Sequence, residues 1–306
     1  TLSSSSAASD VYKRQAILGA NVIYGVNYSI AKDVMPEYIQ PFGFIFCRVL
    51  GALILFWLLQ LVVKTDQVEK KDFIRLFICG VFGVASNQLT FFYGLNLTTP
   101  INAAIIMTCN PILVLVFSAF LIKERITPFK VLGIFLGLAG AAGLILNNAT
   151  LNISSGNFMG DMFIFLNATS YAIYLVTVKP LMNKYSPLTV IKWVFLFGFT
   201  IVIPFGFTEF QAIEWNSFNP SIWGAFIFVV VGTTFLAYLF NIYGLKRLNP
   251  SVVSTYIYSQ PLIASLVALL MQKDELNTIK IVSAIFIFVG VYLVSRKQKV
   301  KAAPTD

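Results

Sequence analysis

Two segments decide the fold: residues 93–111 read YGLNLTTPINAAIIMTCNP, and residues 243–261 read YGLKRLNPSVVSTYIYSQP. They lie 150 positions apart, and their Tyr-Gly-Leu tripeptides and their prolines coincide without a gap. The same register matches Lys123 with Lys273 and Gly140 with Gly290. Because an internal repeat sets the architecture of a chain, we expect two related halves.

The chain is too apolar to be one soluble domain. Of its 306 residues 58% are hydrophobic and 11% are charged, and the mean hydropathy is +0.80, so that lipid must be part of its solvent. About 20 helical residues cross a bilayer core. Ten apolar segments have about this length: roughly 16–34, 41–63, 73–95, 100–122, 129–146, 160–182, 188–208, 221–245, 250–271 and 279–295. The sequence predicts an all-α membrane protein with ten transmembrane helices and the lipid bilayer as a partner.

The basic residues predict the orientation of these helices. With the N-terminus in the cytoplasm, 18 of the 22 Lys and Arg lie at cytoplasmic ends, Lys32, Lys273 and Lys280 lie outside, and Arg48 lies within a span. Such an excess marks the cytoplasmic side, so we expect both termini there. Because each half holds five helices, the second half enters the membrane with inverted topology. We expect a multi-pass protein of the bacterial inner (plasma) membrane.

The apolar segments also predict domain boundaries. Residues 1–15 are rich in Ser and Ala and read as a non-native or disordered leader. Residues 16–147 form the first five-helix repeat, 158–296 the second, and 297–306 a basic cytoplasmic tail. A cleaved signal peptide is the alternative for 16–34, but polar residues interrupt its apolar centre and no small-residue cleavage site follows.

Two proline-containing pairs are expected near the bilayer midplane. Thr99-Pro100 and Asn249-Pro250 read as helix starts, and Asn110-Pro111 and Gln260-Pro261 follow ten residues later, about 15 Å into each helix. An interior proline frees the carbonyl four residues earlier. The freed carbonyls are those of Met107 and Ile257. Such groups are tolerated beside protein or a wet cavity, so the pairs indicate kinks, a cavity, or both.

The segments 91–145 and 243–293, together with a membrane-embedded arginine in the second helix, resemble the two repeats of EamA-type transporters of the drug/metabolite transporter superfamily. The resemblance covers the chain from residue 16 onward. It implies ten helices, a central cavity between two bundles, and export or exchange of amino acids and related small metabolites by alternating access. The substrate itself is not specified.

Neutral polar side chains are concentrated in a subset of the predicted helices and indicate where a small-molecule substrate binds. Polar groups within spans line cavities or bond other helices, and each such bond is worth only about 0.6 kcal/mol. Aromatic faces with amides suit an amphipathic metabolite. The candidate substrate-binding residues are Asn27, Asn87, Asn110, Asn167, Tyr171, Tyr174, Asn241, Tyr256 and Gln260. Core or interfacial packing is the alternative for Tyr171 and Tyr174.

Gating or conformational roles are predicted for Arg48, Pro111 and Pro261. Arg48 lies about 10 Å below the outer end of its helix, where it either extends outward to the headgroups or faces the cavity and pairs with an anionic group. No Asp or Glu falls at mid-membrane depth in the sequence. We therefore expect exchange, facilitated diffusion or coupling through peripheral acids rather than a buried carboxylate relay.

Other classes of function are disfavoured. The chain has no histidine and no P-loop, so we expect no enzyme activity, no catalytic residues, no metal site and no cofactor. Its basic residues form no face suited to nucleic acid. A sugar-phosphate or nucleotide-sugar translocator would need more buried cations, and a channel or structural membrane protein is the remaining alternative. The small-residue face Gly133, Gly137 and Gly140 packs against the last helix or against a second protomer, which leaves a homodimer open.

Overall fold

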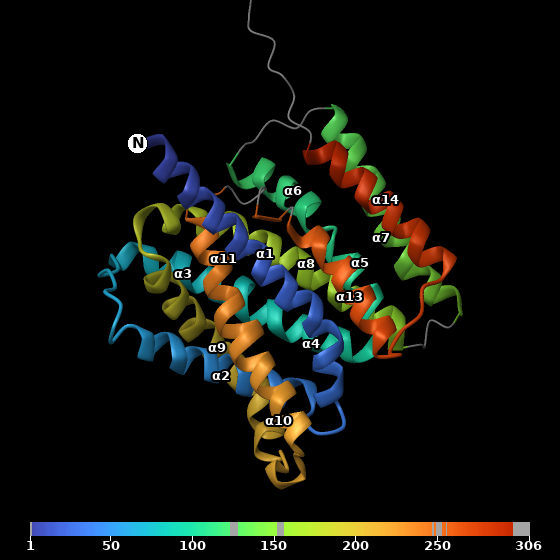
Figure 1. The fold of residues 1–306 in the computed structure, drawn as a ribbon, viewed down its shortest axis with the longest axis horizontal. Helices are drawn as coiled ribbons and strands as arrows, with labels where there is room; N and C mark the ends of the chain where they lie inside the picture. The colour runs from blue at the N-terminus through green and yellow to red at the C-terminus, as the bar shows by residue number, and fades with distance from the viewer. Residues whose placement is uncertain are drawn as a thin grey trace, which may run out of the picture.

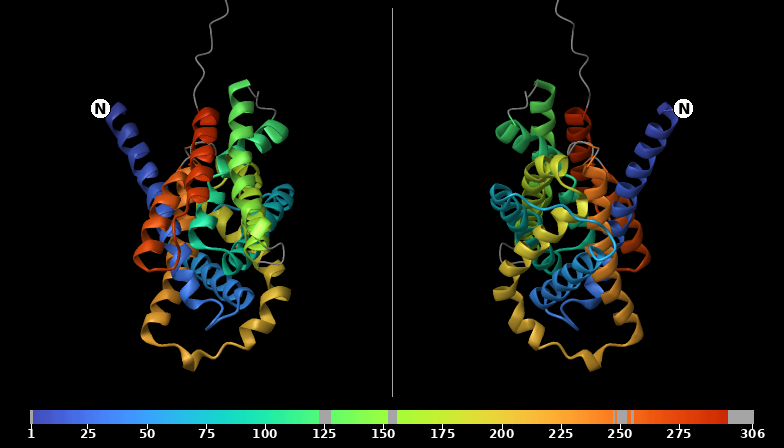
Figure 2. Two further views of the ribbon diagram at one scale, coloured as in Figure 1. Left: turned by 90° about the vertical axis from the view of Figure 1, so that its right-hand side faces the viewer. Right: turned by 90° about the vertical axis from the view of Figure 1, so that its left-hand side faces the viewer.

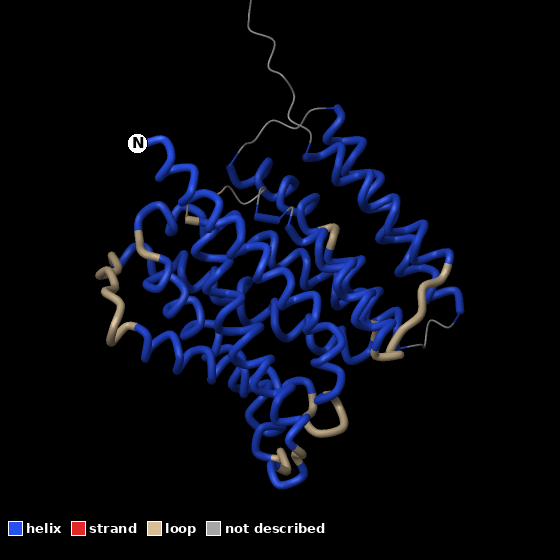
Figure 3. Tube along the Cα trace, in the orientation of Figure 1, coloured by secondary structure: helices blue, strands red, loops and turns tan. Residues whose placement is uncertain are grey.

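The computed structural model describes residues 2–122, 128–151, 156–246, 248, 253–254 and 256–295. Throughout this part of the chain every regular element is a helix, and the connections are short (Figure 3). The helices form one bundle from which the first turns of α1 project (Figures 1 and 2). The basic tail 297–306 and the second predicted helix start, Asn249-Pro250, lie outside the described residues.

The elements follow the predicted segments in order. The first half holds α1 (Leu2–Val34), α2 (Pro41–Leu59), η1 (Lys70–Asp72), α3 (Phe73–Gly80), η2 (Val81–Ala85), α4 (Ser86–Leu97), α5 (Pro100–Met107), α6 (Asn110–Ile122) and α7 (Pro128–Leu151). The second half holds α8 (Gly156–Lys184), α9 (Pro187–Gln211), η3 (Trp215–Ser217), α10 (Pro220–Ile227), η4 (Phe228–Leu236), α11 (Ala237–Leu245), η5 (Tyr256–Tyr258), α13 (Ser259–Leu270) and α14 (Thr278–Ser295). Helix α1 includes residues 2–15 of the predicted leader.

Six helical segments within the described residues are long and apolar enough to cross a membrane. They are Pro41–Leu59, Lys70–Leu97, Pro100–Leu121, Asn157–Lys184, Pro187–Gln211 and Pro220–Leu245. Three shorter apolar helices accompany them, namely Pro128–Gly143, Tyr256–Leu270 and Thr278–Gly290, and the predicted span 16–34 lies in α1. This pattern is that of a multi-pass helical membrane protein. The count of ten spans and the side of the termini stay predictions.

Prolines begin five of the described helices, because their fixed φ and missing N–H suit the first turn. Pro41, Pro100, Pro128, Pro187 and Pro220 are each the first residue of a helix. The Thr99 side chain accepts a hydrogen bond from the backbone N–H of Asn102 at 3.4 Å. The helix start predicted at Thr99-Pro100 is therefore confirmed.

The helices that carry the two central prolines are broken at the predicted place. Helix α5 ends at Met107, and Thr108 and Cys109 donate to the carbonyls three residues earlier at 3.0 Å before α6 begins at Asn110. In the second half η5 passes into α13 at Ser259, directly before Gln260-Pro261. The tighter turns replace α-helical hydrogen bonds just before each proline, because its ring and missing N–H disrupt the preceding helical turn.

Two π-helical segments occur at equivalent places in the repeat, and no pattern in the sequence predicted them. Segment η2 spans Val81–Ala85, and a shift of 150 residues places it within η4, Phe228–Leu236. Segments of this type widen the helix by one residue per turn and are found mostly at functional sites. Each leads directly into a helix, α4 or α11, that contributes to the pocket described below.

The helices pack in reciprocal pairs. Helix α1 packs against α11 and α13, whereas α8, the first helix of the second half, packs against α4 and α6. Helix α2 packs against α9 and η4, and α9 packs against η2. The first helix of each half therefore lies between the third and fourth spans of the other half, so the two halves interlock rather than sit side by side.

Helices α7 and α14 form a separate pair at the edge of the bundle (Figures 1 and 2). A Cβ atom added to Gly290 would lie 2.5 Å from the Gly133 carbonyl oxygen, and one added to Gly140 would lie 2.8 Å from the Ser283 carbonyl oxygen. Small residues permit such close backbone approach. The predicted glycine face thus packs against the last helix of the same chain.

Candidate functional site

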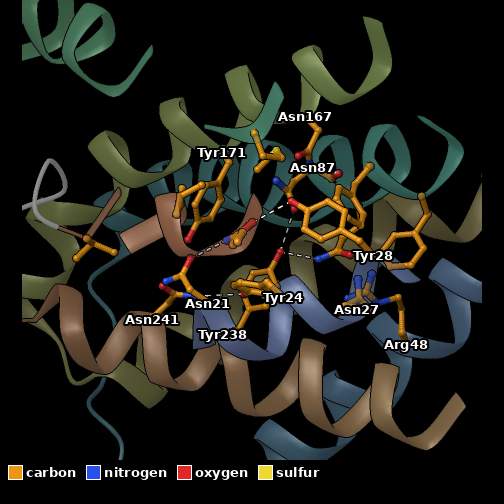
Figure 4. Close-up of a pocket in the computed structure, with 17 residues that line it drawn as sticks. Asn21, Tyr24, Asn27, Tyr28, Arg48, Asn87, Asn167, Tyr171, Tyr238 and Asn241 are labelled. Carbon is orange, nitrogen blue, oxygen red and sulfur yellow. Dashed lines mark hydrogen bonds between the residues drawn. The ribbon is translucent and has the colours of Figure 1, made fainter. Parts of the chain in front are cut away.

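A cavity of about 620 Å³, part of which opens to solvent, lies between helices of both halves (Figure 4). The lining residues are Asn21, Tyr24, Asn27, Tyr28, Arg48, Asn87, Gln88, Phe91, Phe92, Met107, Asn167, Tyr171, Tyr238, Asn241, Val253, Ile257 and Gln260. Amides, phenol hydroxyls and aromatic rings dominate, so the surface is neutral and amphipathic apart from one guanidinium. None of these lining residues is acidic.

Six of the nine candidate substrate-binding residues line this cavity. They are Asn27, Asn87, Asn167, Tyr171, Asn241 and Gln260. Arg48, for which the sequence predicted a gating role, lines it as well. Met107 and Ile257, whose carbonyls the two prolines would free, also face it. The structure therefore brings the polar residues of several distant segments to one place.

Asn110, Tyr174 and Tyr256 lie elsewhere. Asn110 is fully buried, and its amide donates to the Ala168 carbonyl oxygen at 2.8 Å, which joins α6 to α8. The Tyr174 ring packs on η2 so closely that a Cβ added to Gly83 would lie 2.4 Å from it. The Tyr256 hydroxyl accepts from Arg14 Nη1 at 3.5 Å. Pro111 and Pro261 are likewise absent from the lining.

Gln260 fastens α13 to α1. Its Nε2 donates to Asn21 Oδ1 at 2.6 Å, and its Oε1 accepts from the Tyr28 hydroxyl at 2.9 Å. All three side chains are buried. Both polar atoms of the Gln260 amide are therefore satisfied within the protein, and a ligand that needs them must displace Asn21 or Tyr28.

Tyr238 connects the halves at the opposite wall. Its hydroxyl accepts from Gln88 Nε2 at 2.5 Å and donates toward the Gly83 carbonyl oxygen at 3.0 Å and Asn87 Oδ1 at 3.1 Å. Gln88 and Tyr238 are 150 residues apart, so they occupy equivalent places in the repeat. The carbonyl of Gly83 belongs to η2, and Tyr238 thereby supplies a donor to a distorted turn.

Two asparagine side chains present unpaired acceptors to the cavity. Asn167 donates from Nδ2 to the Asn87 carbonyl oxygen at 2.7 Å, but its Oδ1 is buried without a hydrogen bond from the described residues. The same holds for Oδ1 of Asn27. At the far end Asn241 donates to the Tyr24 hydroxyl at 3.3 Å. Buried acceptors without donors are uncommon in native proteins, so these two are suited to a ligand.

Arg48 projects from α2 into the same cavity. Its exposed fraction is 2%. Nε donates to Thr234 Oγ1 at 2.8 Å, Nη2 lies 3.4 Å from Thr233 Oγ1, and the guanidinium carbon lies 4.0 Å from the centre of the Phe92 ring. The arginine therefore turns inward rather than outward to the headgroups.

The π-helical segment η4 orients the hydroxyls of Thr233 and Thr234 toward Arg48. Both Thr233 and Thr234 donate their hydroxyl hydrogens to the Val229 carbonyl oxygen, which the widened turn leaves accessible. Their oxygen lone pairs then point to Arg48. This link explains how a local backbone distortion in the second half holds a charged side chain of the first half.

Several lining residues were not among the predicted site residues. They are Asn21, Tyr24, Tyr28, Gln88, Phe91, Phe92, Met107, Tyr238, Val253 and Ile257. The repeat offers a signal for some of them, because the offset of 150 pairs Gln88 with Tyr238. Aligning Pro41 with Pro187 likewise pairs Asn21 with Asn167.

Apolar helices from both halves that enclose a polar cavity are those of a multi-pass helical membrane protein. The described residues contain no group of three His, Cys, Asp or Glu side chains placed to hold a metal ion. The model of the EamA-like transporter family matches residues 15–146 and again residues 158–296, and the chain belongs to this family. The resemblance of the two segments to EamA-type repeats is therefore confirmed.

Relatives extend over nearly the whole chain. The uncharacterized transporter YyaM of Bacillus subtilis is 24% identical over 289 residues, which cover 91% of this chain and 92% of the relative. An uncharacterized transporter of Archaeoglobus fulgidus is 27% identical and covers 85% of this chain and 89% of its own length. A crystal structure of another protein matches with a TM-score of 0.65 over 93% of this chain and 96% of that chain at 18% identity. At that identity the match shows the fold alone.

Proposed function

We propose that this membrane transporter exports or exchanges small amphipathic metabolites such as amino acids across the bacterial inner membrane. The cavity lined from both halves carries the proposal. Its amides and hydroxyls can replace the hydration shell of a polar group, while its aromatic rings cover an apolar body. No separate soluble domain is needed, because the cavity lies within the helices themselves.

Alternating access around this cavity is the proposed mechanism. The walls are joined across the halves by neutral hydrogen bonds, such as those of Gln260 and Tyr238, and such bonds are individually weak in membrane bundles. The broken helices contribute Met107, Ile257 and Gln260 to the cavity, and the π-helical segments lead directly into α4 and α11, which also line it. Weak contacts between the halves and interrupted helices are both suited to a rearrangement that opens one end while the other closes.

We further propose ten transmembrane helices with both termini in the cytoplasm. With this topology, different ion pairs lie at the cytoplasmic and outer ends of the helix bundle. At the proposed cytoplasmic end, Lys184 pairs with Asp72 at 2.6 Å. At the proposed outer end, Lys273 pairs with Asp33, and Lys280 pairs with Asp274 at 2.5 Å.

These outer contacts secure the helix ends beside the cavity. Asp274 also accepts from the backbone N–H of Ile101 at 3.0 Å, so the connection between α13 and α14 is held to the start of α5. Because the lining residues include no acid, we propose exchange or facilitated diffusion rather than a carboxylate proton relay.

A translocator of sugar phosphates or nucleotide sugars is the alternative carrier. Phosphate groups carry two charges and are bound by clusters of Arg and Lys, but Arg48 supplies the single cation in the lining of the cavity. This favours a substrate with one anionic group or none. A channel or structural role is less consistent with a cavity whose polar lining residues come from both halves.

Counterflow in proteoliposomes tests the proposal. Vesicles that contain the purified protein are loaded with one amino acid or related metabolite, and uptake of the labelled compound is followed. We expect saturable counterflow with a few solutes, lowered in Gln260→Ala and retained by folded Asn110→Ala, whose side chain lies outside the cavity. Flux without saturation or counterflow would indicate a channel, and no flux with any solute would contradict the proposal.

A further inference from the structure

Arg48 is a buried cation for which the structure provides only neutral partners. Two threonine hydroxyls and the face of Phe92 surround the guanidinium. An arginine carries five N–H donors and no acceptor, and a buried charge without an ionic partner is costly. Nη1 is buried and has no hydrogen-bond partner among the described residues.

The vacant donors of Arg48 share one edge of the guanidinium. Nε and Nη2 form the side edge, and Thr234 and Thr233 occupy it. The end edge, made by Nη1 and the second hydrogen of Nη2, has no hydrogen-bond partner given by the described residues. Two parallel N–H groups on one edge match the two oxygens of a carboxylate. Figure 4 places the guanidinium at one end of the cavity, beside Asn27.

The lining of the cavity contains no carboxylate that would neutralise Arg48. Besides Arg48 itself it holds seven amide-bearing side chains and six phenyl or phenol rings. The corresponding residue in the second half is Val194, when Pro41 is aligned with Pro187. The charge is thus confined to one wall of the cavity, which gives the site a fixed polarity.

We propose that Arg48 is the receptor for a carboxylate of the substrate, and that the cavity selects organic monoanions or zwitterions over neutral and cationic molecules of the same shape. This inference rests on the proposed transport function. The carboxylate binds the vacant edge of Arg48. The unpaired Oδ1 atoms of Asn27 and Asn167 accept from amine or hydroxyl donors elsewhere on the same molecule, and the aromatic rings contact its body.

The test compares matched carboxylates and carboxamides. The panel holds butanoate, 4-methylpentanoate, 3-phenylpropanoate, L-leucine and L-glutamine beside the corresponding amides. Purified wild-type protein, Arg48→Lys, Arg48→Met and Thr200→Val are heated with each probe in detergent, and the shift in Tm gives the affinity. Thr200 is exposed on α9 and serves as the control. Counterflow of the same probes is measured in proteoliposomes.

We expect at least one acid to bind wild-type protein and Thr200→Val on the order of 10- to 100-fold more tightly than its amide, since charged hydrogen bonds contribute about 1.5–3 kcal/mol. The preference should vanish in Arg48→Met and be reduced in Arg48→Lys, which keeps the charge but not the fork. If Arg48→Met does not fold, the test uses the wild-type protein alone. Its preference for the acid over the amide should then be present above the pKa of the probe carboxyl and be lost below it.

Equal binding of acids and amides to the wild-type protein, no binding by any probe, or a preference that survives in Arg48→Met would overturn the inference. Failure of the proposed function has a separate signature. If acids and amides undergo equal counterflow, the transport function stands and the role of Arg48 is wrong. If acids bind through Arg48 but no probe undergoes counterflow, the anion site stands and transport is wrong.

Discussion

The hydroxyl of Tyr238 forms hydrogen bonds with three groups of the first half, so its removal should measurably lower the free energy of unfolding. It accepts from Gln88 and donates toward Gly83 and Asn87, with distances between 2.5 and 3.1 Å. Tyr238 is 5% exposed, so water does not replace the lost bonds. In Tyr238→Phe, the buried Gln88 amide and the Gly83 carbonyl each lose a hydrogen-bond partner.

The expected magnitude follows from those lost contacts. A buried polar group left without a partner costs about 1–3 kcal/mol, whereas hydrogen bonds in membrane bundles average about 0.6 and reach about 1.7 kcal/mol. We expect Tyr238→Phe to lower the free energy of unfolding by about 1–2 kcal/mol. For a chain of this size the corresponding fall in Tm is roughly 2–3 °C.

Thermal unfolding in detergent, followed by tryptophan fluorescence at one scan rate, measures this effect. Tyr243→Phe is the matched control, because Tyr243 lies on the same helix α11 and is 43% exposed. We expect its Tm to equal that of the wild-type protein. If Tyr238→Phe and Tyr243→Phe shift Tm equally, the bond between the halves contributes nothing and the reasoning is refuted.

Two further perturbations probe the helix packing and one loop contact. Gly290→Ala places a Cβ 2.5 Å from a backbone oxygen of α7, whereas Gly224→Ala places one in open space. We therefore expect Gly290→Ala to lower the free energy of unfolding by about 1–3 kcal/mol and Gly224→Ala to leave it unchanged. Equal Tm values for the two variants would contradict the close packing of α7 and α14. Hydrogen bonds from Ser186 hold the pKa of Asp66 below its usual value. A carboxylate with a lowered folded-state pKa stabilises the fold above its unfolded pKa of about 3.9, and this contribution is lost as the pH falls through the folded pKa. Asp66→Asn should therefore lower Tm at pH 7, with a difference that shrinks below about pH 3.9; a difference that persists at lower pH would contradict this assignment.

Much of the helical framework follows from local signals in the sequence. Apolar length located the spans, and Thr99-Pro100 marked a helix start because capping and proline geometry act within a few residues. The breaks before Pro111 and Pro261 were predictable for the same reason, since proline disrupts the turn that precedes it. Such features need no knowledge of which helices become neighbours.

The site could be predicted only in part, because side-chain direction depends on the partner helix. Asn110 and Gln260 are equivalent in the repeat, but Asn110 finds a carbonyl of α8 whereas Gln260 meets Asn21 and Tyr28 at the cavity. The π-helical segments also escaped prediction. Their accessible carbonyls are satisfied by tertiary partners, such as Tyr238 on Gly83, and no local pattern specifies these partners.

Ligand protection of a cysteine within the cavity tests the central claim most directly. The Oδ1 atom of Asn27 has no partner among the residues that the structure describes, so Asn27→Cys should disturb the fold little. The native Cys47, Cys79 and Cys109 are buried. We predict that the solute with the strongest counterflow slows alkylation of Asn27→Cys by a maleimide in a saturable manner and leaves an exposed Thr200→Cys control unaffected. Equal alkylation of Asn27→Cys with and without that solute would contradict the claim that this cavity binds the transported molecule.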